Sequence, residues 1–273
     1  MPDHIQINFP GLQPEQQEIL VAQLAELGFE SFEETESELS AFISAPEFDE
    51  TLLRSVAYKY QIEYNIRLIP ERNWNAVWES QFTPVVIGNF VAVRADFHPP
   101  VGTVEHEIVI TPKMSFGTGH HATTRMMLRR MASVTFAGKT VLDLGTGTGI
   151  LSILAEKLGA AAVIAVDIDP WSITNAEENL QKNGCAVVKV SNAGNWGNEF
   201  YDVVLANINR NVILQNLGTI SSRLRRSGLL LISGILLADL EEFTAEADRF
   251  QLKLLDRDEE EGWLCAAFEK TVE

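Results

Sequence analysis

Two neighbouring segments indicate the fold: Thr140-Val141-Leu142-Asp143-Leu144-Gly145-Thr146-Gly147-Thr148-Gly149, and then Val163-Ile164-Ala165-Val166-Asp167-Ile168-Asp169. An apolar run enters a glycine-rich turn, a helix-like segment follows, and a second apolar run ends in an acid. This order predicts a strand–turn–helix–strand unit of a Rossmann-like α/β fold, with a ligand site at the carboxyl ends of the strands. Glycine suits such a turn because it adopts positive φ and leaves room for a ligand against the backbone.

The spacing of glycines and acids indicates which ligand the turn binds. Asp167 lies about 20 residues beyond the turn, where a carboxylate accepts hydrogen bonds from ribose hydroxyls. A dinucleotide fingerprint has its third glycine at the position that Ile150 holds here. Asp143, just before the turn, would oppose a pyrophosphate but suits the sulfonium and ammonium groups of S-adenosylmethionine. The motif resembles the cofactor site of class I methyltransferases.

Composition narrows the setting and the partners. The 273 residues contain no run of about 18 apolar residues and no N-terminal basic region with an apolar core, so we expect neither a membrane span nor a signal peptide. Two distant cysteines, Cys185 and Cys265, fit a reducing, cytoplasmic setting. A net charge of −17 disfavours direct nucleic-acid binding and favours a basic partner, although it could serve solubility alone.

Residues 1–70 have a different pattern from the rest of the chain. Alternating and amphipathic segments predict strands at His4–Phe9, 29–36, 38–45 and 62–69, with helices from Pro14 to Gly28 and over 47–60. This order predicts a small ferredoxin-like α+β domain. It contains no glycine-rich loop and no cluster of His, Cys or Ser, so we interpret it as a substrate-recognition module; a structural appendage is the alternative.

Residues 71–113 read as a connecting segment. Trp74 and Trp78 are four residues apart and would share one face of a short helix. Strands are expected at Val85–Ala95 and Glu105–Thr111. The segment is too apolar for a disordered linker.

Residues 114–273 are expected to form the catalytic domain. A helix over Thr124–Ser133 would be capped by Thr123 or Thr124. The adjacent His120 and His121 point in different directions, so we expect no metal site. The later pattern predicts further parallel strands, at Ala186–Val190, Asp202–Ala206 and Gly228–Ser233, helices at Leu214–Leu224 and Asp239–Arg249, and a terminal antiparallel hairpin. This topology places Gly145, Asp167 and Asn207 around one crevice.

Taken together, the motifs resemble the family of methyltransferases that modify large-subunit ribosomal protein eleven. The resemblance is carried by four pieces in order: Asn73–Trp78 with Phe82 and Pro84; Phe116-Gly117-Thr118-Gly119 with His121 and Thr123-Thr124; Asp143–Gly149 with Asp167-Ile168-Asp169-Pro170; and Ala206-Asn207-Ile208. It implies transfer of methyl groups from S-adenosylmethionine to lysine or N-terminal amines of that basic ribosomal protein, which the N-terminal domain would hold. We expect a monomer.

The motifs and the resemblance together nominate the site residues. Asn207 is expected both to bind the cofactor and to position the amine that accepts the methyl group. The residues expected to bind the cofactor are Phe116, Gly117, Thr118, Gly119, Thr124, Asp143, Gly145, Gly147, Asp167, Ile168 and Asn207. A dedicated base is not obligatory, because a dry pocket beside a sulfonium favours the neutral amine.

The sequence departs from the family pattern at several positions and leaves alternatives open. His120 and Ala122 stand where the family usually has Thr and Pro, Thr146-Gly147-Thr148 replaces Cys-Gly-Ser, and Asn209-Arg210-Asn211 replaces a Gly-Pro pair. These departures concern substrate choice more than cofactor binding. The alternatives are a methyltransferase for another protein or a small molecule, and a cofactor-binding assembly factor without catalysis. A nucleotide-dependent oxidoreductase is disfavoured by Ile150 and Asp143.

Overall fold

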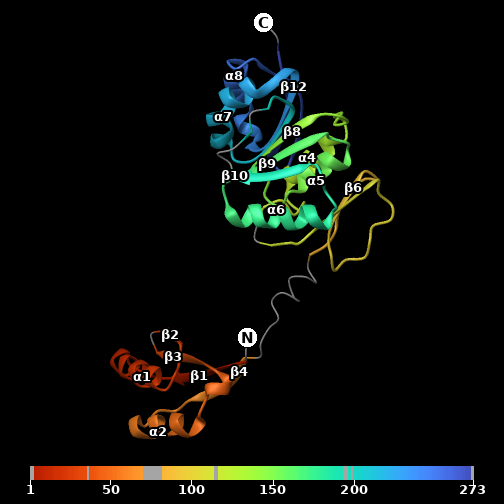
Figure 1. The fold of residues 1–273 in the computed structure, drawn as a ribbon. Helices are drawn as coiled ribbons and strands as arrows, with labels where there is room; N and C mark the ends of the chain where they lie inside the picture. Colours follow the sequence, from red (N-terminus) through yellow and green to blue (C-terminus); the bar gives the residue numbers. More distant parts are fainter. Residues whose placement is uncertain are drawn as a thin grey trace. The chain divides into compact units, whose positions relative to one another are not determined.

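The computed structural model describes residues 3–35, 37–69, 82–113, 116–192, 196–197 and 199–271. The chain forms two compact units, Met1–Gln81 and Phe82–Glu273 (Figure 1). The predicted helix with Trp74 and Trp78, and with it the Asn73–Trp78 motif, lies outside the described residues. No helix in the described ranges is long and apolar enough to cross a membrane.

The N-terminal unit has the element order that its sequence predicted. Its core is formed by apolar side chains such as Ile7, Phe9, Leu20 and Leu53, all 1% exposed or less. The strands make an antiparallel sheet in the order β2-β3-β1-β4, which is the ferredoxin-like arrangement. The elements are β1 (His4–Pro10), α1 (Pro14–Glu26), β2 (Ser31–Glu34), β3 (Glu38–Ser44), α2 (Glu50–Tyr60) and β4 (Asn65–Ile69).

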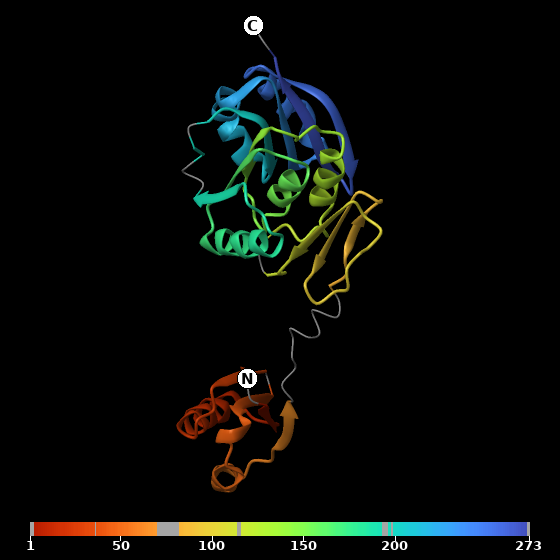
Figure 2. The same ribbon diagram turned by 45° about the vertical axis from the view of Figure 1, so that its right-hand side comes forward.

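The second unit is built on a seven-stranded sheet in the order β10-β9-β8-β11-β12-β14-β13 (Figure 2). Neighbouring strands from β10 to β12 run parallel, and β14 pairs antiparallel with both β12 and β13. The expected Rossmann-like sheet with a terminal hairpin is therefore confirmed. The strands are β8 (Thr140–Leu144), β9 (Ala162–Asp167), β10 (Val188–Asn192), β11 (Tyr201–Asn207), β12 (Leu224–Leu236), β13 (Leu252–Glu260) and β14 (Trp263–Lys270).

Helices cover both faces of this sheet. Successive strand residues point to opposite faces, so Leu205 joins one core with α4 and α5, while Val204 joins the other with α7 and α8. Both cores are closed to water, as buried parallel strands require. The helices are α4 (Ala122–Met131), α5 (Ile150–Lys157), α6 (Pro170–Lys182), α7 (Arg210–Arg223) and α8 (Leu240–Asp248).

A three-stranded sheet of β5 (Val85–Ile87), β6 (Val91–Ala95) and β7 (His106–Ile110) belongs to the same unit. The sequence suggested one strand over Val85–Ala95, but a turn with Gly88 at φ 54° divides it into two. Side chains of β6 and β7 join the core that α4 and α5 cover, so residues 82–113 pack with the larger unit rather than forming a separate connecting segment.

The starts of two helices differ from the expectation. His121, rather than Thr123 or Thr124, caps α4, because its Nδ1 accepts a hydrogen bond from the Thr123 amide. Helix α7 begins at Arg210, and the Asn209 side chain caps it by accepting from the Val212 amide at 3.0 Å. The Asn209-Arg210-Asn211 departure from the family pattern is thus a helix start.

Candidate active site

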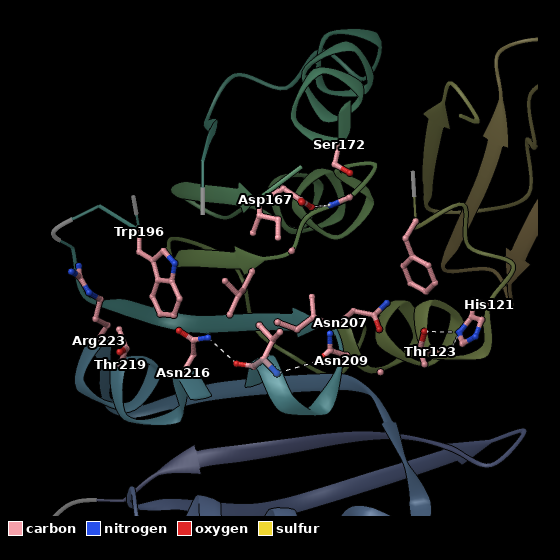
Figure 3. Close-up of a pocket in the computed structure, with 18 of the residues that line it drawn as sticks. His121, Thr123, Asp167, Ser172, Trp196, Asn207, Asn209, Asn216, Thr219 and Arg223 are labelled. Carbon is pink, nitrogen blue, oxygen red and sulfur yellow. Dashed lines mark hydrogen bonds between the residues drawn. The ribbon is translucent and has the colours of Figure 1, made fainter. Parts of the chain in front are cut away.

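A pocket of about 860 Å³ opens at the carboxyl ends of the parallel strands. Its walls come from β8, β9 and β11, from the glycine-rich turn, from α7 and from the segment before α4. Figure 3 shows Asp167 and Asn207 in its middle, with His121 at one end and Trp196 and Arg223 at the other. The crevice expected around Gly145, Asp167 and Asn207 is therefore present as one pocket.

The glycine-rich turn is possible only with glycine. Gly145 and Gly147 have φ of 73° and 56°, and both line the pocket. A Cβ on Gly145 would lie 2.2 Å from Cγ2 of Ile208, and one on Gly147 would lie 2.3 Å from the carbonyl oxygen of Phe116. Both separations are far below any van der Waals contact, so these glycines allow the chain segments around the pocket to approach closely.

Asp167 ends β9 and faces the pocket in a fixed orientation. Its Oδ2 accepts a hydrogen bond from the Gly147 amide at 2.9 Å, and its Oδ1 accepts from the Asp169 amide at 3.0 Å. Each oxygen retains lone pairs for a further donor. The carboxylate can therefore accept further hydrogen bonds from a group in the pocket.

Asp143 differs from Asp167 because it lies beneath the turn and does not line the pocket. It is 1% exposed, and its Oδ2 accepts from the hydroxyls of Thr146 and Ser152, both at 2.6 Å. Burial raises the pKa of this carboxyl, although the two hydroxyl groups partly oppose the shift. Its Oδ1 is buried and has no hydrogen-bond partner within the part of the chain that the structure describes.

Asn207 ends β11 and faces the pocket opposite the glycine-rich turn. Its Nδ2 donates to the Thr124 hydroxyl at 3.3 Å, which orients the amide. Its Oδ1 is buried and unpaired with respect to the described residues. Thr124 is buried and does not line the pocket, so its contribution to the site is the hydrogen bond that orients the Asn207 amide.

The segment from Phe116 to Gly119 lies against the turn. Phe116 lines the pocket with its side chain 53% exposed, whereas the next three residues do not line it. Thr148 binds this segment: its amide donates to the Phe116 carbonyl at 3.1 Å and its hydroxyl to the Gly117 carbonyl at 2.6 Å. Ile168, also a predicted contact, lines the pocket beside Asp167.

Sequence reasoning missed an aromatic wall at one end of the pocket. The rings of Phe116 and His121 lie 5.4 Å apart, and those of His121 and Trp263 lie 5.1 Å apart. All three line the pocket. Trp263 begins β14, and nothing local in the sequence signals that this strand reaches the segment before α4.

The pocket also fits the cofactor that the motif indicates. The buried Oδ1 of Asn207 lacks a donor within the described ranges, and Asp167 offers a carboxylate to the pocket. Such a set of acceptors suits a ligand that carries ribose hydroxyls and positive charge, and the close approach at Gly145 and Gly147 leaves backbone exposed to it. In the same described ranges, no group of three or more His, Cys, Asp or Glu could hold a metal ion.

Comparison with known proteins identifies the family. The family model of "Ribosomal protein L11 methyltransferase (PrmA)" matches residues 11–271. The chain is 37% identical to the ribosomal protein L11 methyltransferase of Porphyromonas gingivalis, over 92% of this chain and 90% of the relative. It is 35% identical to that of Chlorobaculum parvum, over 98% and 96%.

A solved structure shows the same relationship. The crystal structure of ribosomal protein L11 methylase from Lactobacillus delbrueckii subsp. bulgaricus matches with a TM-score of 0.64 and 26% identity, covering 70% of this chain and all of that one. The resemblance to a methyltransferase family and the expected Rossmann-like fold are thereby confirmed. The chain belongs to the ribosomal protein L11 methyltransferase family.

Proposed function

We propose that this protein transfers methyl groups from S-adenosylmethionine to lysine amines, the N-terminal amine, or both, of ribosomal protein L11. The observation that supports this most directly is the pairing of two features in one pocket. Asp167 offers a carboxylate for a ribose, and Asn207 offers an acceptor oxygen that has no partner among the described residues, in the same pocket that the aromatic wall lines. The first feature suits the cofactor and the second suits an amine.

The residues that would hold the cofactor are those of the turn and the strand ends. Asp167 would accept from the ribose hydroxyls, with Ile168 beside it as an exposed apolar surface. The backbone at Gly145 and Gly147 would contact the ligand closely, and Asp143 would support the turn from beneath through its hydrogen bonds with Thr146 and Ser152. When bound, the cofactor supplies an electrophilic methyl group on a sulfonium.

The work left to the protein is to position a neutral amine. A lysine amine has a pKa of about 10.4 in water, so it must lose a proton before it can react. Entry into a pocket walled by Phe116, His121 and Trp263 removes water and lowers the pKa of that amine. The Oδ1 of Asn207 would then accept an amine hydrogen and aim the lone pair, and such positioning can supply much of the acceleration.

The aromatic wall would also suit repeated transfer. After each transfer the product is an ammonium group, which is attracted to the faces of the Phe116 and Trp263 rings by about 0.5–2 kcal/mol until it loses a proton. An amine that has already gained a methyl group would therefore still be held beside these rings. A pocket of this kind does not reject partly methylated products.

The N-terminal unit would hold the ribosomal protein. Between His4 and Ile69 the basic residues are Arg54, Lys59 and Arg67, against a large excess of Asp and Glu. This acidity favours encounter with a basic partner. We assign substrate recognition to residues 1–70 and the chemistry to the larger unit, acting as a monomer without direct nucleic-acid contact. Because ribosomal proteins are made in the cytoplasm, we place the reaction there.

Intact-mass analysis of purified L11 after incubation with the protein and S-adenosylmethionine tests the proposal. We expect mass gains in whole methyl steps that are lost with Asp167→Ala. A second, equally basic ribosomal protein serves as the control substrate and should gain no mass. Gains on that control alone would mean a different protein substrate. No gain on either, with S-adenosylhomocysteine still bound, would mean a cofactor-binding protein without this activity.

A further inference from the structure

Thr148 joins the two segments that form the cofactor side of the pocket. It lies inside the glycine-rich turn between Gly147 and Gly149, and it is completely buried. Its amide and its hydroxyl both point at the segment before α4, where they donate to the carbonyls of Phe116 and Gly117 at 3.1 Å and 2.6 Å. The side chain and the backbone of one residue therefore hold two successive carbonyls.

The third polar group of Thr148 is held from the opposite side. Its carbonyl accepts from Nδ2 of Asn179 at 2.8 Å, and Asn179 is itself completely buried in α6. The Oδ1 of Asn179 accepts from the Thr111 amide at 2.7 Å, just beyond β7. Thr148 thus cannot turn away from the Phe116 segment without breaking buried hydrogen bonds, which is costly.

The fit between the two segments is close in both directions. A Cβ on Gly117 would lie 2.8 Å from the Thr148 hydroxyl, and a Cβ on Gly147 would lie 2.3 Å from the Phe116 carbonyl. By contrast, burial does little to hold Phe116 itself, because its side chain is 53% exposed. The described contacts that hold this segment over the pocket are therefore the hydrogen bonds to Thr148 and the ring contact of Phe116 with His121.

We infer that Thr148 is a positioning residue for the cofactor: its hydroxyl docks the Phe116–Gly119 segment onto the glycine-rich turn before any ligand binds. A docked segment makes the free protein competent for binding, because affinity falls in proportion to the fraction of molecules in the competent state. The inference rests on the proposed function only in assigning this segment to the cofactor.

The test compares Thr148→Val, Thr148→Ser and Thr174→Val with the wild-type protein. Valine keeps the shape of threonine and removes the hydroxyl, whereas serine keeps the hydroxyl. Thr174 is a control on the exposed face of α6: its hydroxyl donates to the Pro170 carbonyl at 3.0 Å, and the residue does not line the pocket described above. Two readouts are used: hydrogen exchange of peptides covering 116–121 without ligand, and binding of S-adenosylhomocysteine by calorimetry.

Loss of one buried hydrogen bond should raise the opening constant of the segment by about fivefold to tenfold. We therefore expect Thr148→Val to speed exchange of the 116–121 peptides and to weaken binding by about two- to threefold each, because the two fold-changes multiply to the change in the opening constant. Thr148→Ser should restore both readouts to near wild type, and Thr174→Val should change neither.

Each other outcome has a distinct meaning. Wild-type binding by Thr148→Val, or Thr148→Ser as weak as Thr148→Val, would overturn the inference, because the hydroxyl would then not be responsible. Faster exchange with unchanged affinity would overturn it as well, since docking would not matter for binding. If the wild-type protein bound no S-adenosylhomocysteine, the cofactor assignment would fail, whereas the exchange data would still report whether Thr148 docks the segment.

Discussion

Replacing Asp167 with asparagine should separate the charge of this side chain from its shape. Both carboxylate oxygens accept backbone hydrogen bonds, from Gly147 at 2.9 Å and from Asp169 at 3.0 Å. An asparagine has one oxygen, so its amide NH₂ must face one of these two N–H groups in either orientation. One backbone donor is then left unpaired beside another donor.

The size of the effect follows from these two contacts and from the ligand. An unpaired donor in a partly buried position costs about 1–3 kcal/mol, so the free protein should lose about that much unfolding free energy. The hydrogen bonds from a ribose would change from charge-assisted to neutral, which roughly halves their strength. We expect S-adenosylhomocysteine to bind about 10- to 100-fold more weakly, which corresponds to about 1.4–2.8 kcal/mol.

Calorimetric titration with S-adenosylhomocysteine measures the affinity, and urea unfolding of the free protein measures the stability. Asp202→Asn is the matched control: Asp202 accepts from the Thr140 amide at 2.9 Å at the opposite end of β11, and it lines no part of the pocket. The hydrogen bond from the Thr140 amide can be kept in this variant, because an asparagine side chain still has one acceptor oxygen. If Asp167→Asn bound the ligand within twofold of wild type, the assignment of Asp167 to the ribose would be wrong.

Three further changes test other parts of the site. Gly147→Ala should displace Phe116 and weaken S-adenosylhomocysteine binding by more than tenfold. Gly184→Ala is the control, because Gly184 has a φ of 67° but open space around it; this change should cost about 1 kcal/mol of stability and no affinity. Equal effects of the two changes on affinity would contradict the steric argument. The pKa of Asp143 is raised in the folded state, so its contribution to stability is present below the unfolded pKa of about 4 and is lost as pH rises through the folded pKa. Asp143→Asn should therefore make the unfolding free energy, measured with urea, depend less on pH above pH 4. If the variant and the wild-type protein lost stability in parallel, this reasoning would be wrong. Asn207→Ala should slow methylation of L11 about 10- to 100-fold by intact mass while changing cofactor affinity less, and an unchanged rate would exclude a role in orienting the amine.

Much of the fold could be predicted because its signals are local. The apolar runs of β8 and β9, the glycines between them and Asp167 at a strand end are all set by short stretches of chain, and the structure places them as expected. Element boundaries were less predictable. His121 competes with Thr123 and Thr124 for the same helix start, and only the direction in which the chain enters α4 decides between them.

The parallel sheet, the glycine-rich turn and the kind of ligand can be inferred from short stretches of sequence, since the hydrophobic period and positive φ are properties of neighbouring residues. The direction of each side chain and the meeting of distant residues depend instead on long-range packing. The sequence assigns both Asp143 and Asp167 to the ligand, yet the turn buries the first and presents the second to the pocket. Trp263 reaches His121 because the antiparallel β14 returns beside β12, a long-range pairing that no local pattern encodes.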